Sequence, residues 1–275
     1  MTWLALCAAP ILFGFADFFG GVLSRRVSAW AVVGVTSAIS AVFALVWAVL
    51  TGSLSWEGDV VIRGVLAGLL YVVGYALFFR ALSIGKAGVV GAIVSLSLLP
   101  PVVADVIRGQ LPSAPQLLGI LAIGVGVVVI SQPRSIRGGS GTYVLIAIAA
   151  ALLLGTQYVL LGRASQANPD LGVICQFAAA ALVVLVIGLV KRTMGGVDRA
   201  MAPRLFGLGM LFGIAGLCFS TAMSGINVAV VSAVVLTEPA VLAILGLVFK
   251  DERLTPAQWG ALVVVIAGAV VTSVG

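Results

Sequence analysis

Long apolar runs separated by short polar turns make up almost the whole chain. The clearest example runs from Val228 to Val271, where an apolar run containing Glu238 and Pro239 ends at a charged turn and a second apolar run follows. An apolar segment of about 20 residues crosses the hydrocarbon core of a bilayer as a helix. After the turn, Thr255 and Pro256 supply a capping hydroxyl and a proline suited to the first helical position. This pattern predicts a helical hairpin with a carboxylate in its first arm.

The same criterion, applied along the chain, predicts an all-α membrane protein with ten transmembrane helices and no soluble domain. The predicted spans are residues 3–23, 29–50, 60–82, 89–107, 116–130, 142–161, 171–190, 205–223, 227–249 and 258–273.

A constant offset of 141 residues relates the two halves of the sequence. Residues 81–94 match residues 222–235 without a gap, and the same offset pairs Pro115 with Pro256. An ungapped offset over this length indicates two copies of one unit. Each copy holds five predicted spans, an odd number, so the second copy must enter the membrane inverted relative to the first. Inverted repeats are typical of secondary transporters, whose binding site lies where the halves meet.

The predicted domain organisation follows from these repeats. It consists of a first five-helix repeat, a connecting loop and a second five-helix repeat, over residues 1–131, 132–141 and 142–275 respectively.

Composition agrees with a membrane protein and excludes several classes. Hydrophobic residues make up 62% of the chain and charged residues 9%, whereas soluble domains carry about 25% charged residues. The chain has no histidine and only three scattered cysteines, so we expect no metal site, no disulfide framework and no cofactor. The net charge of +6 lies in short loops and indicates membrane topology instead of nucleic-acid binding.

The loop charges also predict an orientation. Basic residues concentrate in cytoplasmic loops, and the ten-span arrangement puts most of them on one side. That side holds Arg25, Arg26, Arg80, Lys86, Arg134, Arg137, Lys191, Arg192, Arg199, Arg204, Lys250 and Arg253, and the other holds Arg63, Arg108 and Arg163. We therefore expect a multi-pass protein of the plasma or inner membrane with both termini outside.

Two acidic residues lie within predicted spans. Glu238 falls near the midplane, and Pro239 beside it removes a backbone hydrogen bond. A carboxylate at this depth costs about 2.5 kcal/mol or more and usually marks a substrate or ion pathway, so Glu238 is a candidate for proton coupling. The alternative is a glutamate that only fixes one helix to another. Asp17, deep in the first span, is either a charge partner for the solute or an interfacial residue near Arg25.

Further polar groups are candidates for the same site. Pro100 and Pro101 interrupt the fourth predicted helix close to Ser97, which the offset pairs with Glu238. The freed carbonyls need a partner in water, side chains or ligand, although a packing kink is an equal alternative. Rings with polar tips suit a ligand pocket, but such residues also form helix-to-helix hydrogen bonds. This set comprises Tyr71, Tyr75, Gln157, Tyr158 and Gln176.

Two segments carry a resemblance to a known family. Phe13–Gly21, with the sequence FGFADFFGG, and the hairpin formed by TEPAV, DERLT, Gln258 and Gly260 resemble EamA-type members of the drug/metabolite transporter superfamily. The resemblance implies two EamA units over the whole chain. Where the acidic turn of the hairpin would fall in the first copy, the chain has Arg108-Gly109-Gln110-Leu111 and no glutamate. Well-known ten-helix members are usually drawn with both termini inside, opposite to the loop-charge prediction.

These features together predict a secondary transporter and not an enzyme. We expect export of small metabolites or drug-like solutes such as amino acids or amines, with protons as a candidate coupling ion and the lipid bilayer as surroundings. Facilitated uptake of sugar or nucleotide-like solutes is the alternative within transport. A membrane enzyme or a structural subunit is the alternative outside it. The chain has no phosphate-binding loop of the Walker type, which argues against ATP-driven pumping by this chain alone.

Overall fold

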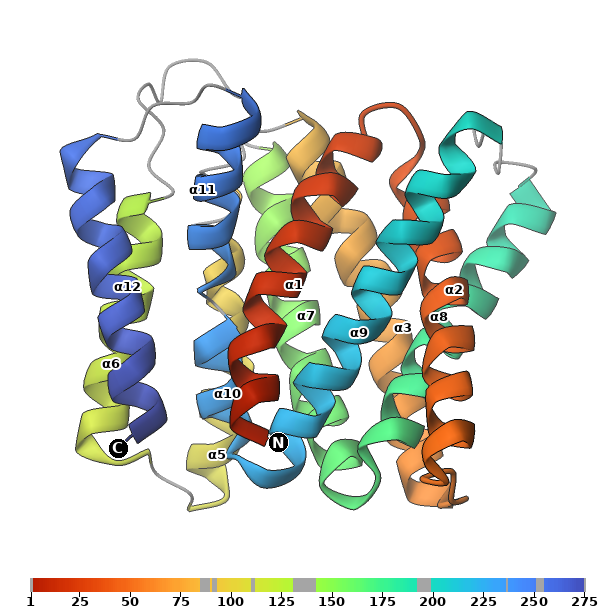
Figure 1. The fold of residues 1–275 in the computed structure, drawn as a ribbon, viewed down its shortest axis with the longest axis horizontal. Coiled ribbons are helices and arrows are strands. Elements are labelled where there is room, and N and C mark those ends of the chain that lie inside the picture. Colours follow the sequence, from red (N-terminus) through yellow and green to blue (C-terminus); the bar gives the residue numbers. More distant parts are fainter. Residues whose placement is uncertain are drawn as a thin grey trace.

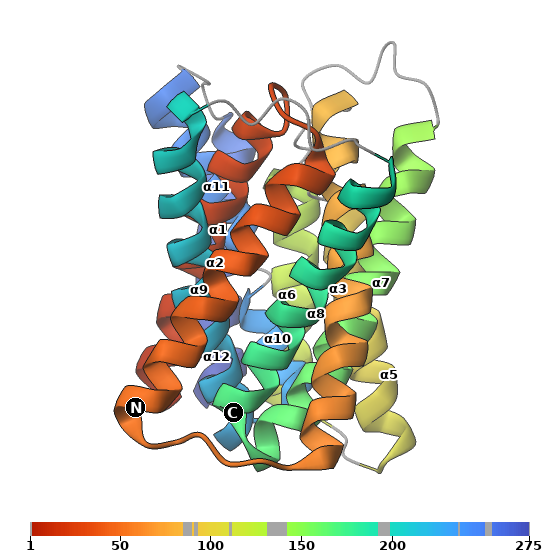
Figure 2. The ribbon, with the colours of Figure 1, turned by 90° about the vertical axis from the view of Figure 1, so that its right-hand side faces the viewer.

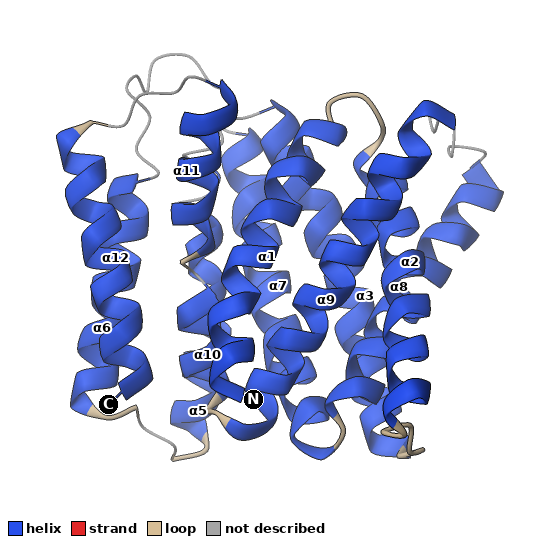
Figure 3. Ribbon diagram, in the orientation of Figure 1, coloured by secondary structure: helices blue, strands red, loops and turns tan. Residues whose placement is uncertain are grey.

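The computed structural model of the chain describes residues 2–84, 90, 93–109, 112–130, 142–191, 199–235, 237–250 and 255–274. Within these ranges every regular element is a helix, as Figure 3 shows. The all-α prediction is therefore confirmed for the described part of the chain. The connecting loop predicted at residues 132–141 lies outside it.

The helices of the first half follow the predicted spans closely. They are α1 (Thr2–Leu23), α2 (Ala29–Thr51), α3 (Gly58–Ile84), the 3-10 helix η1 (Ser95–Leu98), α5 (Leu99–Ile107) and α6 (Ala114–Ile130).

The second half repeats this order. It contains α7 (Thr142–Ala167), α8 (Pro169–Lys191), the 3-10 turn η2 (Arg199–Met201), α9 (Ala202–Gly225), α10 (Val228–Val235), α11 (Glu238–Lys250) and α12 (Pro256–Val274). As expected from the Thr255-Pro256 pair, α12 begins at Pro256.

Six helices in the described part are long and apolar enough to cross a membrane, namely α1, α2, α3, α7, α8 and α9. Three shorter apolar helical segments accompany them, over Ser95–Ile107, Ala114–Val129 and Trp259–Gly268. The chain is thus a multi-pass membrane protein, while the count of ten spans remains a prediction.

The two halves run in opposite directions through the bundle. In Figure 1, α1 begins at the lower end, next to the N-terminus, whereas α7 begins at the upper end, and Figure 2 shows the same arrangement from the side. Both chain termini lie at the lower end. Because both termini lie at the same end, the chain crosses the membrane an even number of times if the two ends of the bundle face opposite sides of the membrane.

Helix packing divides most of the bundle into two groups of helices. One group, the α3 body, joins α3, α5, α7 and α8, and the other, the α1 body, joins α1, α2, α9 and α11. Each helix of one body has its repeat counterpart in the other. The two bodies meet mainly where α2 packs on α8, and α6 and α12 pair with each other at one edge (Figure 1).

Two glycines at equivalent positions allow close helix contacts in the two bodies. A Cβ atom on Gly14 of α1 would lie 2.6 Å from Val241 Cβ and 3.4 Å from the carbonyl oxygen of Glu238. A Cβ atom on Gly155 of α7 would lie 2.4 Å from the carbonyl oxygen of Ser97. The 141-residue offset exchanges these two contacts. The repeats therefore pack by the same rule, with the first helix of each copy lying on the broken helix of the other.

The predicted continuous helix over residues 227–249 is wrong, because α10 ends at Val235 and α11 begins at Glu238. Proline at 239 has no N–H, and its ring clashes with the carbonyl four residues earlier, which is that of Val235. Within the first turn of a new helix, by contrast, proline is tolerated because that N–H has no partner in any case. The chain turns between the two helices, with Thr237 N donating to Val234 O at 3.0 Å.

The first repeat has a 3-10 segment at the equivalent place, within a run that stays helical. In the helix predicted over residues 89–107, the described residues 90, 93 and 94 are helical, η1 follows and ends at Leu98, and α5 carries Pro100 in its first turn. The repeat offset pairs Ser97 of η1 with Glu238 at the start of α11. Interrupted helices at matching positions of two inverted repeats are where transporters place their binding sites.

Candidate functional site

Two carboxyl groups meet where α1 passes the start of α11. Asp17 is 3% exposed, and Glu238 stands in the first turn of α11. Their side chains share a hydrogen bond, which requires a proton on one of the two carboxyl groups because an ionised carboxylate can only accept. The N-terminus of α11 also favours negative charge at this point. The pair is thus arranged to hold one proton. The side chain of Pro239 lies outside the described part.

Asp17 has unused hydrogen-bonding capacity. Its Oδ1 atom is buried and has no hydrogen-bond partner. Burial of an unpaired acceptor is costly, so a ligand that donates to this oxygen would gain more than it would at the protein surface.

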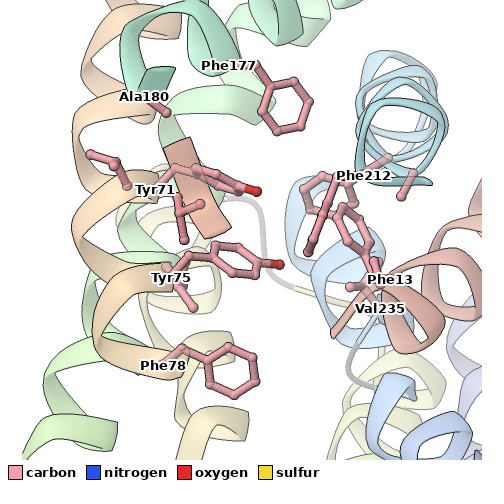
Figure 4. Packing of buried hydrophobic residues seen from close by; sticks show 14 of the residues in the cluster. Phe13, Tyr71, Tyr75, Phe78, Phe177, Ala180, Phe212 and Val235 are labelled. Carbon is pink, nitrogen blue, oxygen red and sulfur yellow. The ribbon is translucent and has the colours of Figure 1, made fainter. Parts of the chain in front are cut away.

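Tyrosines of α3 face the carboxyl pair across the bundle. The rings of Tyr71 and Tyr75 lie 4.5 Å apart, and Figure 4 shows both hydroxyl groups pointing away from α3 toward Phe13 and Phe212 of the α1 body. Edge contacts fix the rings, with Tyr71 at 5.4 Å from Phe177 and Tyr75 at 5.6 Å from Phe212. The hydroxyl groups are therefore held in position.

Tyr158 of α7 completes this cluster. Its ring lies 5.0 Å from that of Phe219, which in turn lies 5.8 Å from Phe13 of α1. Tyr158 is within electrostatic range of both Asp17 and Glu238, and so is Tyr75. The resulting candidate site joins two acids of the α1 body to three tyrosines of the α3 body.

The remaining sequence candidates occupy other positions. Gln157 Nε2 donates to Gln176 Oε1 at 2.6 Å, which links α7 to α8, and Gln157 Oε1 is buried without a partner. Ser97 is buried where η1 packs on Gly155. Electrostatic interactions thus relate Tyr71, Tyr75 and Tyr158 to the two acids, whereas in the described part of the chain no hydrogen bond or ring contact connects Gln157 or Ser97 to that group.

Tyr71, one of the polar residues named from the sequence, lies beside Tyr75 in this cluster. It precedes Tyr75 by four residues, so the two lie on one helical face. The spacing of four residues in the sequence therefore indicates that Tyr71 and Tyr75 belong to one site. Within the described residues no group of three or more histidine, cysteine or acidic side chains could hold a metal ion.

Apolar helices with an acid pair at a helix break are features common among membrane transporters. Comparison with protein families is more specific. The model of the EamA-like transporter family matches residues 1–132 and 141–274, and the chain belongs to that family. The resemblance seen in the sequence is therefore confirmed, as two repeats over the whole chain.

Comparisons with individual proteins add support for the fold alone. A search of curated proteins returned no match. Among solved structures, 29 chains match. One, described as "Crystal structure of protein", is similar with a TM-score of 0.76 and 19% identity, over 97% of this chain and 96% of that chain.

Proposed function

We propose that this transporter is a proton-coupled exporter of small cationic or zwitterionic solutes such as amines or amino acids. The observation that supports this most directly is the hydrogen-bonded pair of Asp17 and Glu238 inside the bundle. Negative charge there attracts a cation, and the shared proton can leave when a cation takes its place. Proton and solute would then compete for one site, which couples their opposite movements.

The surrounding rings favour the same class of solute. Aromatic faces attract ammonium groups by about 0.5–2 kcal/mol, more when water is excluded. Tyr71, Tyr75 and Tyr158 supply such rings beside the acids. Their hydroxyl groups would also suit a neutral polar solute, so facilitated uptake of a sugar-like solute is the second candidate.

The proposed topology has ten spans in two inverted five-helix repeats in the cell membrane. The opposite directions of α1 and α7 in Figure 1 support it, as do both termini at one end. We assign residues 1–131 and 142–275 to the repeats, and we place the termini outside because of the loop charges.

Flux into proteoliposomes tests the function. With an acidic interior, an amine supplied outside should accumulate about tenfold as protons leave, and collapse of the gradient with an ionophore should remove the accumulation. A panel of amines, amino acids and sugars identifies the solute class. Accumulation that persists without the gradient would rule out proton coupling, and flux of sugars alone would favour the second candidate.

Labelling of single cysteines tests the orientation. Glu57, before α3 at the lower end, and Ala200, before α9 at the upper end, are both exposed. In a variant without native cysteines, an impermeant reagent applied to intact cells should label Glu57→Cys and spare Ala200→Cys. Neither change removes a basic residue, so the topological signal stays intact. The reverse labelling would place both termini inside.

A further inference from the structure

The loop between α2 and α3 is bonded to the corner between α7 and α8 at the lower end of the bundle. Ser53 donates its hydroxyl hydrogen to the carboxylate of Asp170, and Asn168 Nδ2 donates to Ser55 Oγ at 2.7 Å. Ser53 is itself held to α2, because Gly52 ends that helix in the left-handed conformation and the next N–H bonds back to its last turn. The α1 body is thereby tied to the α3 body.

A second tie lies beside the first. Ser220 of α9 donates to the carbonyl oxygen of Pro169 at 2.8 Å, and its hydroxyl oxygen lies 2.5 Å from that of Ser165 on α7. Ser165 and Ser220 are both fully buried. Hydrogen bonds shielded from water are costly to leave unmade. We call Ser53, Asp170, Ser165 and Ser220 the lower latch.

The repeat counterparts of these residues have a different chemistry. The 141-residue offset pairs Ser53 with Met194, Asp170 with Ala29 and Ser220 with Phe79. Ser24, the counterpart of Ser165, donates its hydroxyl hydrogen to Gly21 O in the last turn of α1, at 2.9 Å, as Ser165 donates to Leu161 O of α7 at 2.7 Å. Met, Ala and Phe side chains cannot form the corresponding bonds. Judged by residue type, the counterparts at the upper end therefore cannot repeat these hydrogen bonds.

We propose that the lower latch biases the empty transporter toward the conformation closed at the end that carries both termini. This inference rests on the proposed carrier function, in which the α1 and α3 bodies separate at one end at a time around the acid pair. With equal repeats the two conformations would be close in free energy. The latch adds hydrogen bonds that its repeat counterparts cannot form, and it must break before the site opens at the lower end.

Distance measurement between spin labels tests the latch without any solute. Gln166 at the lower end of α7 and Ser224 at the lower end of α9 belong to different bodies. The repeat offset turns this pair into Arg25 and Ser83 at the upper end, which serves as the matched second pair. Labels are attached to cysteines introduced after replacement of Cys7, Cys175 and Cys218. The unmodified latch should give one short lower distance by pulsed electron paramagnetic resonance.

Removal of the latch should change these distances in opposite directions. In Ser53→Ala/Ser220→Ala the ratio of long to short lower distances should rise about tenfold, which equals about 1.4 kcal/mol, while the upper distance shortens. Ser24→Ala, which removes a bond within one helix, should change neither. An unchanged lower distance in the double variant would overturn the proposal.

Two further measurements keep this test decisive. If the double variant melts at a much lower temperature, Asp170→Asn takes its place, with a smaller change expected in the same direction, because the amide oxygen still accepts from Ser53 but carries no charge. The distance measurement involves no transport. A failed flux assay would therefore refute the proposed function and leave the interpretation of the distances unchanged. Unchanged distances together with normal proton-driven flux would refute the latch alone.

Discussion

Glu238→Gln is expected to abolish proton-driven accumulation of solute while the protein stays folded. The amide can still hydrogen-bond to Asp17, since its N–H donates to the carboxylate and replaces the shared proton of the native pair. What it cannot do is release that proton. Accumulation in proteoliposomes with an acidic interior should therefore fall at least tenfold, whereas exchange of labelled for unlabelled solute should continue, because exchange needs no net proton movement.

Glu57→Gln provides the matched control for this experiment. It makes the same chemical change at an exposed position before α3, and accumulation should remain as in the unmodified protein. A well-expressed Glu238→Gln protein with normal gradient-driven accumulation would show that Glu238 only joins α11 to α1. A Glu238→Gln protein that fails to reach the membrane would lead to the same structural conclusion.

Gly155→Ala is expected to cause a large loss of stability. The added methyl group would lie 2.4 Å from the carbonyl oxygen of Ser97 and 2.7 Å from the ring of Pro100. Neither a backbone carbonyl nor a proline ring can rotate away, so α7 must move off η1. Overpacking of this kind costs about 1–3 kcal/mol, and the melting temperature of the detergent-solubilised protein should fall by about 3 °C for each kcal/mol.

Other glycines separate this effect from the general effect of alanine. A methyl group on Gly207 of α9 would meet nothing within 4 Å, and alanine is a better helix former than glycine, so Gly207→Ala should leave the melting temperature unchanged or raise it. Gly14→Ala should behave like Gly155→Ala, because Val241 Cβ would lie at 2.6 Å. Equal melting temperatures for Gly155→Ala and Gly207→Ala would contradict the close-contact explanation.

The fold was largely predictable because each membrane span can be recognised from its own residues. A run of about 20 apolar residues requires no knowledge of its neighbours, and helix ends such as Pro256 follow from capping chemistry. The break between Val235 and Glu238 was missed because residues 227–249 have the right length for one span and prolines are tolerated within membrane helices. Deciding between a kink and a break depends on what packs around the freed backbone groups.

The candidate site was predictable as residues but not as an arrangement. The cost of a buried acid singled out Asp17 and Glu238 one at a time. That they share a hydrogen bond depends on α1 packing along α11, a contact between residues far apart in sequence. Gln157 shows the opposite outcome, since it is adjacent to Tyr158 in sequence yet bonds to Gln176 of α8. Neighbouring residues on a helix face different directions, and only packing decides which direction is the interior.

The fold is duplicated in the two repeats, but the acidic residues of the candidate site are not. The offset that exchanges Gly14 with Gly155 replaces Asp17 by Tyr158 and Glu238 by Ser97. A pair of first halves could repeat the glycine contact but would bring together two aspartates and no glutamate, and a pair of second halves would bring together two glutamates and no aspartate. Neither half-molecule, assembled with its own copy, would rebuild the Asp17–Glu238 pair. Fusion into one chain guarantees that every molecule contains one of each.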